Sequence, residues 1–198
     1  MAEELGVEYL DRPDNSHAKA GNINHALPKT HGDFIAIFDA DHVPLPDFLH
    51  RMLGYFKDPK VAFVQSPQTF YNLDAPEERV DIDSGKHWDE AEIFFHLILP
   101  GKNRWNSVYF YGTGGIIRRT ALEQVGGFAT DTITEDIHTA LKMHQRGWKS
   151  VYIADHLASG GDGALTTDIP GDDYSPGRRA AGPPAADPPV PVHAPACR

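Results

Sequence analysis

The sequence contains one cysteine, Cys197, which is the residue before the last in a chain of 198. A single thiol excludes a disulfide framework and a cysteine-based zinc site within the chain. Long hydrophobic runs are also missing, because the apolar stretches at 34–38, 93–99 and 108–111 fall well short of the ~20 residues that span a bilayer. Residues 1–10 include acidic side chains and no long apolar stretch, which argues against a secretory signal there.

A surplus of basic residues is missing too. The chain has 18 Lys and Arg residues against 28 Asp and Glu, which gives a formal net charge of −10. This balance argues against nucleic-acid binding through a basic surface, so we expect no nucleic-acid partner. An anionic ligand is still compatible with it, because a divalent metal ion can join carboxylates to phosphates.

Large apolar residues become scarce near residue 159. The sequence beyond it is rich in Pro, Gly, Ala and Asp, as in Pro183-Pro184 and Pro188-Pro189. Such a composition buries too little apolar area to offset the entropy of ordering the chain. We therefore expect an ordered domain over residues 1–159 and a disordered tail over residues 160–198.

Residues before that boundary alternate between strand-like and helix-like patterns. A continuous apolar run predicts a buried strand at 33–39, and helical spacing of apolar residues follows Pro46. Similar patterns predict further strands at 61–65, 108–111, 116–118 and 150–153, and further helices at 89–99, 120–126 and 134–147. Pro100-Gly101 is expected to end the helix at 89–99. The alternation predicts an α/β fold with a layered sheet, whose ligands bind at the carboxyl ends of the strands.

Two acidic residues, Asp39 and Asp41, come at the end of the predicted strand at 33–39. Carboxylates at i and i+2 on a turn that leaves a strand can converge on one divalent ion, and Mg²⁺ and Mn²⁺ prefer such oxygen ligands. His42 comes next and offers a further ligand or a hydrogen-bond donor. An ordinary acidic loop is the alternative, and the pair alone does not exclude it.

A second candidate is Lys19, which lies in the sequence H-A-K-A-G-N at a predicted helix start. Its cation and the free backbone N–H groups of a helix start suit a nucleotide or a phosphate. A solvated lysine at an ordinary helix entry explains the same pattern, and taken alone the pattern favours this simpler interpretation.

A third candidate is Asp136, which opens the predicted helix at 134–147 together with Thr134 and Glu135. Acidic residues at a helix N-terminus interact favourably with the helix dipole, so helix capping explains their placement. The functional alternative is a general base, which requires a carboxylate fixed beside the hydroxyl that it deprotonates. The local sequence leaves both interpretations open.

Aromatic and small polar residues form two further segments. Residues 63–67 run from a predicted strand into a turn and include Gln65, whereas residues 109–113 are an aromatic segment that ends in Gly and Thr. Aromatic faces pack against the C–H faces of sugar rings, so these segments suit a carbohydrate. A buried β-hairpin is the alternative.

In their order and spacing, these segments resemble the catalytic subunits of bacterial cellulose synthases, which are processive family-two glycosyltransferases. The resemblance covers about residues 5–160 and depends on the segments K-A-G-N, D-A-D-H, F-V-Q-S-P, Y-F-Y-G-T, G-G-F, T-E-D and R-G-W-K-S-V-Y-I. It implies part of a nucleotide-sugar transferase fold of the GT-A type, with a mixed sheet flanked by helices.

The resemblance also implies a reaction, the inverting transfer of glucose from UDP-glucose to a growing β-1,4-glucan chain. It assigns Lys19, Asp39 and Asp41 to the donor, both aspartates to Mg²⁺ (or Mn²⁺), and Asp136 to the general base. It assigns the acceptor side to Gln65, Tyr109, Phe110, Tyr111, Gly112 and Thr113.

The sequence departs from the family pattern in several places. Tyr111 stands where the family usually has Cys. The family's first strand would precede residue 1, and neither the Q-x-x-R-W motif expected after Ile153 nor the transmembrane helices are found. We therefore expect a truncated or frame-shifted form of a longer enzyme, which by itself makes no detectable glucan.

Location and partners follow from the same resemblance. Members of the family lie in the bacterial inner membrane with a cytoplasmic catalytic domain, and they have a membrane and a periplasmic partner subunit. Because the sequence shows no membrane span, this chain alone is expected in the cytoplasm.

Other interpretations stay open. A related processive synthase could use a different sugar, and an inactive fragment could keep only weak UDP and metal binding. A phosphohydrolase of the haloacid dehalogenase type also has D-x-D after a strand, but there a Thr or similar residue usually follows shortly. Here His42-Val43-Pro44 follow Asp41, which disfavours that class.

Overall fold

The computed structural model describes residues 2, 4–14, 16–70, 80–82, 86–88 and 93–160. These residues belong to the first of the two compact units into which the chain divides, residues 1–165. The predicted tail lies outside the described residues except for Gly160, which ends a strand, so the expected disorder of 161–198 stays a prediction. Within the described ranges, no helix is long and apolar enough to cross a bilayer.

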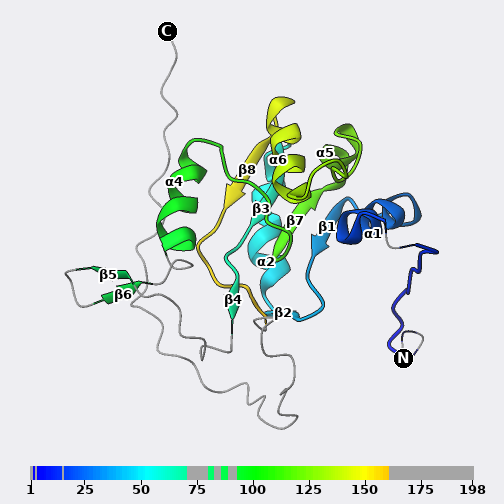
Figure 1. The fold of residues 1–198 in the computed structure, drawn as a ribbon, viewed down its shortest axis with the longest axis horizontal. Coiled ribbons are helices and arrows are strands. Elements are labelled where there is room, and N and C mark those ends of the chain that lie inside the picture. Colours follow the sequence, from blue (N-terminus) through cyan, green and yellow to red (C-terminus); the bar gives the residue numbers. More distant parts are fainter. Residues whose placement is uncertain are drawn as a thin grey trace. The chain divides into compact units, whose positions relative to one another are not determined.

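A mixed sheet forms the centre of the fold (Figure 1). Its strands are β1 (Phe34–Ile37), β3 (Val61–Gln65), β7 (Gly115–Arg118) and β8 (Lys149–Tyr152), in the order β1-β7-β3-β8. Strand β7 runs antiparallel to both β1 and β3, whereas β3 and β8 are parallel. The predicted α/β class and mixed sheet are therefore confirmed.

Burial differs between β1 and β3. Every residue of β3 is buried, but Phe34 and Ala36 of β1 are exposed, so the strand predicted at 33–39 is present but the prediction that it is buried is wrong. This difference in burial follows from the positions of the strands in the sheet. Strand β1 is at the end of the described sheet and is hydrogen-bonded only to β7, whereas β3 lies between β7 and β8. An apolar run does not distinguish these two positions.

Helices cover both faces of the sheet. The elements are α1 (Ala18–Ala26), η1 (Leu27–Lys29), α2 (Phe48–Leu53), η2 (Gly54–Lys57), η3 (Phe94–Ile98), α4 (Leu99–Arg104), α5 (Arg119–Gln124) and α6 (Glu135–Gln145). The expected helices after Pro46, Thr120 and Thr134 correspond to α2, α5 and α6. The helical segment at η3 and α4 continues past Pro100-Gly101, contrary to prediction, because Pro100 occupies the first turn of α4 where its missing N–H is tolerated.

Two smaller sheets complete the described fold. One contains β2 (His42–Pro44), β9 (Ala158–Gly160) and β4 (Thr69–Phe70) in the order β2-β9-β4, and the other pairs β5 (Val80–Ile82) with β6 (Lys86–Trp88). The predicted strand at 108–111 is absent, because this segment is a loop held partly by side chains. The β2–β9 pairing fixes the chain just after Asp41, since His42 is opposite Gly160.

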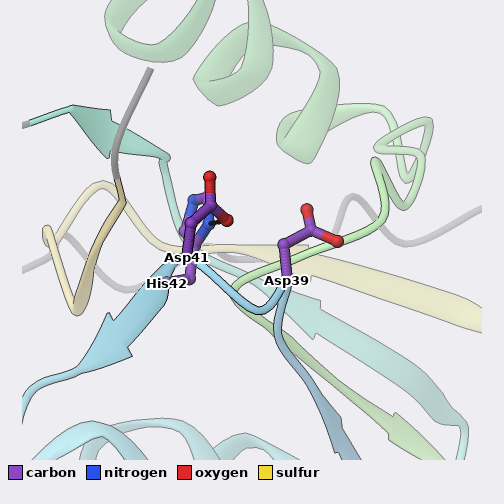
Figure 2. Close-up of side chains that lie close together, drawn as sticks. All are labelled: Asp39, Asp41 and His42. Carbon is purple, nitrogen blue, oxygen red and sulfur yellow. Dashed lines mark hydrogen bonds and ion pairs between the residues drawn. The ribbon is translucent and has the colours of Figure 1, made fainter. Parts of the chain in front are cut away.

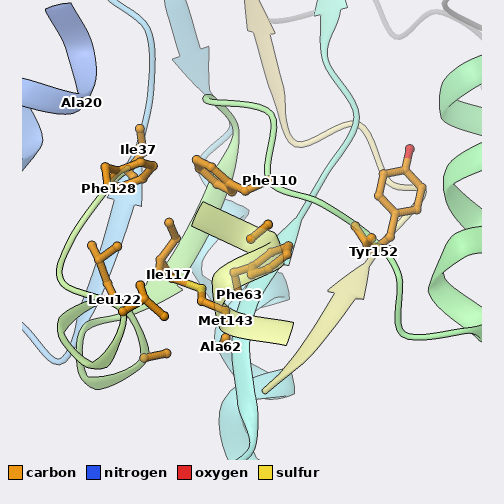
Figure 3. Packing of buried hydrophobic residues seen from close by; sticks show 14 of the residues in the cluster. Ala20, Ile37, Ala62, Phe63, Phe110, Ile117, Leu122, Phe128, Met143 and Tyr152 are labelled. Carbon is orange, nitrogen blue, oxygen red and sulfur yellow. The ribbon is translucent and has the colours of Figure 1, made fainter. Parts of the chain in front are cut away.

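The core lies on both faces of β3 and β7. Phe63 and Ile117 are opposite one another and belong to one cluster, whereas Val64 and Ile116 are the next pair and belong to the other. This is the alternation expected of strands buried on both sides. Figure 3 shows the first cluster, in which Leu122 of α5 and Met143 of α6 also pack. Fully burying such side chains contributes about 1.5–3 kcal/mol each.

Candidate active site

Three side chains that could hold a metal ion lie together between the end of β1 and the first residue of β2 (Figure 2). One potential ligand atom from each of Asp39, Asp41 and His42 lies within 4.8 Å of the others. The two carboxylates are 42% exposed, whereas the His42 side chain is 4% exposed. Carboxylate oxygens with an imidazole nitrogen are a donor set that fits Mg²⁺ or Mn²⁺.

His42 holds the second carboxylate of the pair. Its Nδ1 lies 3.0 Å from Oδ1 of Asp41, and this hydrogen bond lowers the pKa of Asp41. A side chain on Gly160 would meet the His42 ring, because an added Cβ would lie 2.4 Å from its Cε1. The small residue at the end of β9 therefore leaves space for the imidazole beside Asp41.

Lys19 joins two parts of the site. It lies in the first turn of α1, and its Nζ donates hydrogen bonds to Oδ1 of Asp39 and, over 2.6 Å, to the carbonyl oxygen of Gly112. The ammonium group thus contacts both the loop that contains Asp39 and Asp41 (the D-x-D loop) and the segment at 109–113. Lys19 and Asp39, which the resemblance assigns to the same donor, are therefore in direct contact.

Asp136 lies in the first turn of α6, and its carboxylate is also close to Gly112. A Cβ added at Gly112 would lie 3.4 Å from Oδ2 of Asp136 and 3.7 Å from Nζ of Lys19. Desolvation by burial raises the pKa of Asp136 above its ordinary value, although the backbone N–H of Ile137 donates to its Oδ1 over 2.7 Å. Four separate segments therefore converge around Gly112.

The residues assigned to an acceptor fall into two groups. Tyr109, Tyr111 and Gly112 are partly exposed, whereas three others have almost no exposed surface: Gln65 (0%), Phe110 (1%) and Thr113 (0%). Phe110 packs edge-on against Phe63 in the core. Gln65, Phe110 and Thr113 therefore stabilise the segment at 109–113 from inside the protein. Their burial does not fit a direct contact with an acceptor.

Tyr111, where the resemblance leads one to expect Cys, is also held by contacts inside the protein. Its hydroxyl donates to the carbonyl oxygen of Ser66, and burial raises the pKa of the phenol well above its usual value. Tyr111 therefore stays a neutral donor and anchors the loop against the end of β3.

Asn24 is a site-supporting residue that the sequence reasoning missed. Its Nδ2 donates to the carbonyl oxygen of Phe128 over 2.9 Å, and the N–H of Phe128 donates back to its Oδ1 over 2.8 Å. Gly127 makes room for this pair, because an added Cβ would lie 2.5 Å from Oδ1 of Asn24. Helix α1 is therefore tied to the loop that leads into α6. The only available signal was the second Asn of the sequence K-A-G-N-I-N.

Comparison with known proteins agrees with this arrangement. The family model described as Glycosyl transferase family 2 matches residues 1–126. The chain belongs to glycosyl transferase family 2. Among curated relatives, the cellulose synthase catalytic subunit [UDP-forming] of Xanthomonas axonopodis pv. citri is 48% identical over 158 residues, which are 79% of this chain and 22% of the relative. Cellulose synthase 1 of Komagataeibacter xylinus is 47% identical over 162 residues, 81% of this chain and 10% of the relative.

The chain thus spans 22% and 10% of the length of these two relatives. Two solved structures share the fold. A mannosyltransferase from Pyrobaculum calidifontis in complex with GDP-Man and Mn²⁺ has a TM-score of 0.52 at 23% identity, covering 78% of this chain and 38% of that one. TarS 1–349 of S. aureus in complex with UDP-GlcNAc has a TM-score of 0.53 at 12% identity, covering 79% and 42%. The predicted GT-A type fold is confirmed.

Proposed function

We propose that this chain carries the central part of a catalytic domain that transfers glucose from UDP-glucose to a β-1,4-glucan with inversion. The observation that supports it most is the convergence of Asp39, Lys19 and Asp136 around Gly112. A metal-binding pair, a cation and a partly buried carboxylate are the groups that a transfer from a nucleotide diphosphate requires. The relatives named cellulose synthase support the choice of sugar and polymer.

The donor side consists of the D-x-D loop and α1. Asp39 and Asp41 would hold Mg²⁺ or Mn²⁺, and His42 offers a further ligand atom. A divalent ion at this place supplies charge stabilisation for a leaving diphosphate. Lys19 adds a second positive charge on the same side, where its Nζ can exchange the Asp39 carboxylate for a phosphate oxygen.

The acceptor side begins at Asp136. Its carboxylate accepts the proton of the acceptor hydroxyl while that oxygen forms a bond to the anomeric carbon of the sugar. The bond between this carbon and the diphosphate oxygen breaks in the same displacement, and its electron pair leaves with UDP. A single base is enough, because an in-line displacement forms no covalent intermediate. The raised pKa of Asp136 suits a group that must take up a proton.

The segment at 109–112, which lies next to Asp136 and is partly exposed, would bind the end of the glucan. Burial raises the pKa of Tyr109, with the Asp136 charge as a second cause, so these two side chains lie close enough to interact. The Tyr109 ring also has the Lys102 ammonium over it at 5.2 Å from the centroid. A sugar ring stacked on Tyr109 would lie near Asp136. We also propose a growing glucan as the acceptor, and a membrane subunit and a periplasmic subunit as partners.

Thermal unfolding with a panel of donors tests the choice of sugar. A ligand that binds only the folded state stabilises it by RT ln(1 + [L]/Kd), or about 2.7 kcal/mol at a hundredfold excess over Kd. With Mn²⁺ present, UDP-glucose should raise the melting temperature more than UDP-GlcNAc or GDP-mannose at equal concentration. Equal shifts from all three donors would contradict a glucose-specific site, and a larger shift from UDP-GlcNAc would favour a related synthase that uses another sugar.

A further inference from the structure

A buried polar cluster lies where β3 ends and β7 begins. Gln65, Ser66 and Thr113 form it, and each is 0% exposed. Nε2 of Gln65 donates to the carbonyl oxygen of Thr113 over 2.7 Å and to that of Ser66 over 3.0 Å. Oγ of Ser66 donates to the carbonyl oxygen of Gly114 over 2.7 Å. Buried polar groups that are bonded in this way hold one backbone arrangement, because leaving any of them unpaired is unfavourable.

The cluster reaches the metal-binding loop through one side chain. The backbone N–H of Asp39 donates to Oγ1 of Thr113 over 3.0 Å. Two residues earlier, the carbonyl oxygen of Ile37 accepts from the N–H of Gly114 over 2.9 Å. The chain that leaves β1 is therefore bonded to residues 113–114 on both sides of Phe38, just where it turns towards the two carboxylates.

Close packing leaves the loop little freedom to adjust. A Cβ added at Gly115 would lie 2.5 Å from the Phe110 ring and 3.1 Å from Oε1 of Gln65. Gly114 has a φ of 65°, which favours glycine. The Thr113 hydroxyl is consequently held in place by its neighbours, and its own side chain has no exposed surface with which to contact a substrate.

We infer that Thr113 is a positioning residue that fixes the direction of the Asp39 carboxylate for metal binding. The D-x-D loop is hydrogen-bonded to residues 113–114, so the position of the two carboxylates depends on the position of the segment at 109–113. The inference depends on the proposed metal site at Asp39 and Asp41, and it adds a residue whose side chain contacts neither the metal nor the sugar.

Mn²⁺ binding to the whole chain, measured by calorimetric titration, tests the inference without any turnover. Thr113→Val keeps the shape of the side chain but removes the acceptor for Asp39 N–H. We expect Mn²⁺ to bind about tenfold more weakly, the lower end of what supporting residues contribute to metal affinity. Thr113→Ser keeps the hydroxyl and should bind Mn²⁺ like the wild type.

Thr139→Val is the matched control. Thr139 is 1% exposed, and its hydroxyl accepts the N–H of Ala129 over 2.9 Å, but it has no bond to the D-x-D loop. This variant should lower the melting temperature and leave Mn²⁺ affinity unchanged. Equal weakening by Thr139→Val and Thr113→Val would overturn the inference, because the effect would then be a general loss of stability.

Asp41→Ala separates failure of the inference from failure of the proposed site. Loss of Mn²⁺ binding in Asp41→Ala with no change in Thr113→Val would overturn the role of Thr113 and leave the metal site standing. No change in Asp41→Ala would remove the metal site itself. If Thr113→Val does not fold, Thr113→Cys replaces it: the thiol is a weaker acceptor of similar size, so it must bind Mn²⁺ more weakly than Thr113→Ser.

Discussion

Lys19 and Asp39 form an ion pair between the first turn of α1 and the loop that leaves β1. The same ammonium also donates to the Gly112 carbonyl oxygen over 2.6 Å. A cation at this place should weaken the binding of a divalent metal ion and strengthen the binding of the diphosphate that accompanies it. It competes with a divalent ion for the carboxylate, and it attracts the phosphates that the ion would accompany.

Replacing Lys19 should therefore separate metal affinity from nucleotide affinity. In Lys19→Met, Mn²⁺ alone should bind more tightly than in the wild type, because a nearby positive charge has been removed. UDP in the presence of Mn²⁺ should bind more weakly, because a phosphate partner has been lost. Both affinities are measured by calorimetric titration. Lys29→Met, at the end of the same helical segment, is the control and should change neither.

Asp136→Asn should stabilise the folded chain near neutral pH. Burial raises the pKa of Asp136 above its ordinary value of 3.8, so the folded state binds its proton more tightly than the unfolded state does. Stability from this group is therefore present at low pH and is lost as the pH rises through the folded-state pKa. The asparagine keeps the oxygen that accepts the Ile137 N–H and removes the buried charge.

The difference in melting temperature between Asp136→Asn and the wild type should accordingly be positive at about pH 7 and should shrink as the pH falls towards the unfolded-state value. Asp33→Asn, at an exposed position, is the control and should show no such gain. A melting temperature below that of the wild type at neutral pH would contradict the burial of the Asp136 charge.

Asn24→Ala should lower the free energy of unfolding by about 1–3 kcal/mol, because both backbone groups of Phe128 lose their partner. Chemical denaturation measures this loss. Asn22→Ala on the same helix is the comparison, since within the described ranges Asn22 has no side-chain hydrogen bond, and its effect should be small. Equal losses would indicate a general effect of the helix rather than the bond to Phe128.

The sequence predicted the central strands well and their surroundings less well. The runs at 34–38 and 61–65 look alike in hydrophobicity, yet β1 is at the end of the described sheet and β3 is inside it. Which strand lies in the middle depends on pairing between distant segments. The aromatic segment at 108–111 also looked like a strand, but side chains of Gln65 and Tyr111 take part in bonds that hold it as a loop.

The candidate site was also predicted from the sequence only in part. The order of the motifs was enough to predict that Lys19, Asp39 and Asp136 belong together, because the resemblance supplied their roles. It could not show that Gln65 and Thr113 are fully buried, since a polar residue near a site looks the same in sequence whether it contacts a ligand or the backbone. Asn24 was missed for a different reason, because its partner Phe128 is 104 residues away in the sequence.

Titration of UDP with Mn²⁺ into the wild type and into Asp41→Ala is the most direct test of the account. Asp155→Ala removes another exposed carboxylate, whose contact is with Arg51 over 2.6 Å, and serves as the control. We predict that UDP binding depends on Mn²⁺, is lost or greatly weakened in Asp41→Ala, and is unchanged in Asp155→Ala. Equal binding of UDP by the wild type and Asp41→Ala would contradict the proposed donor site.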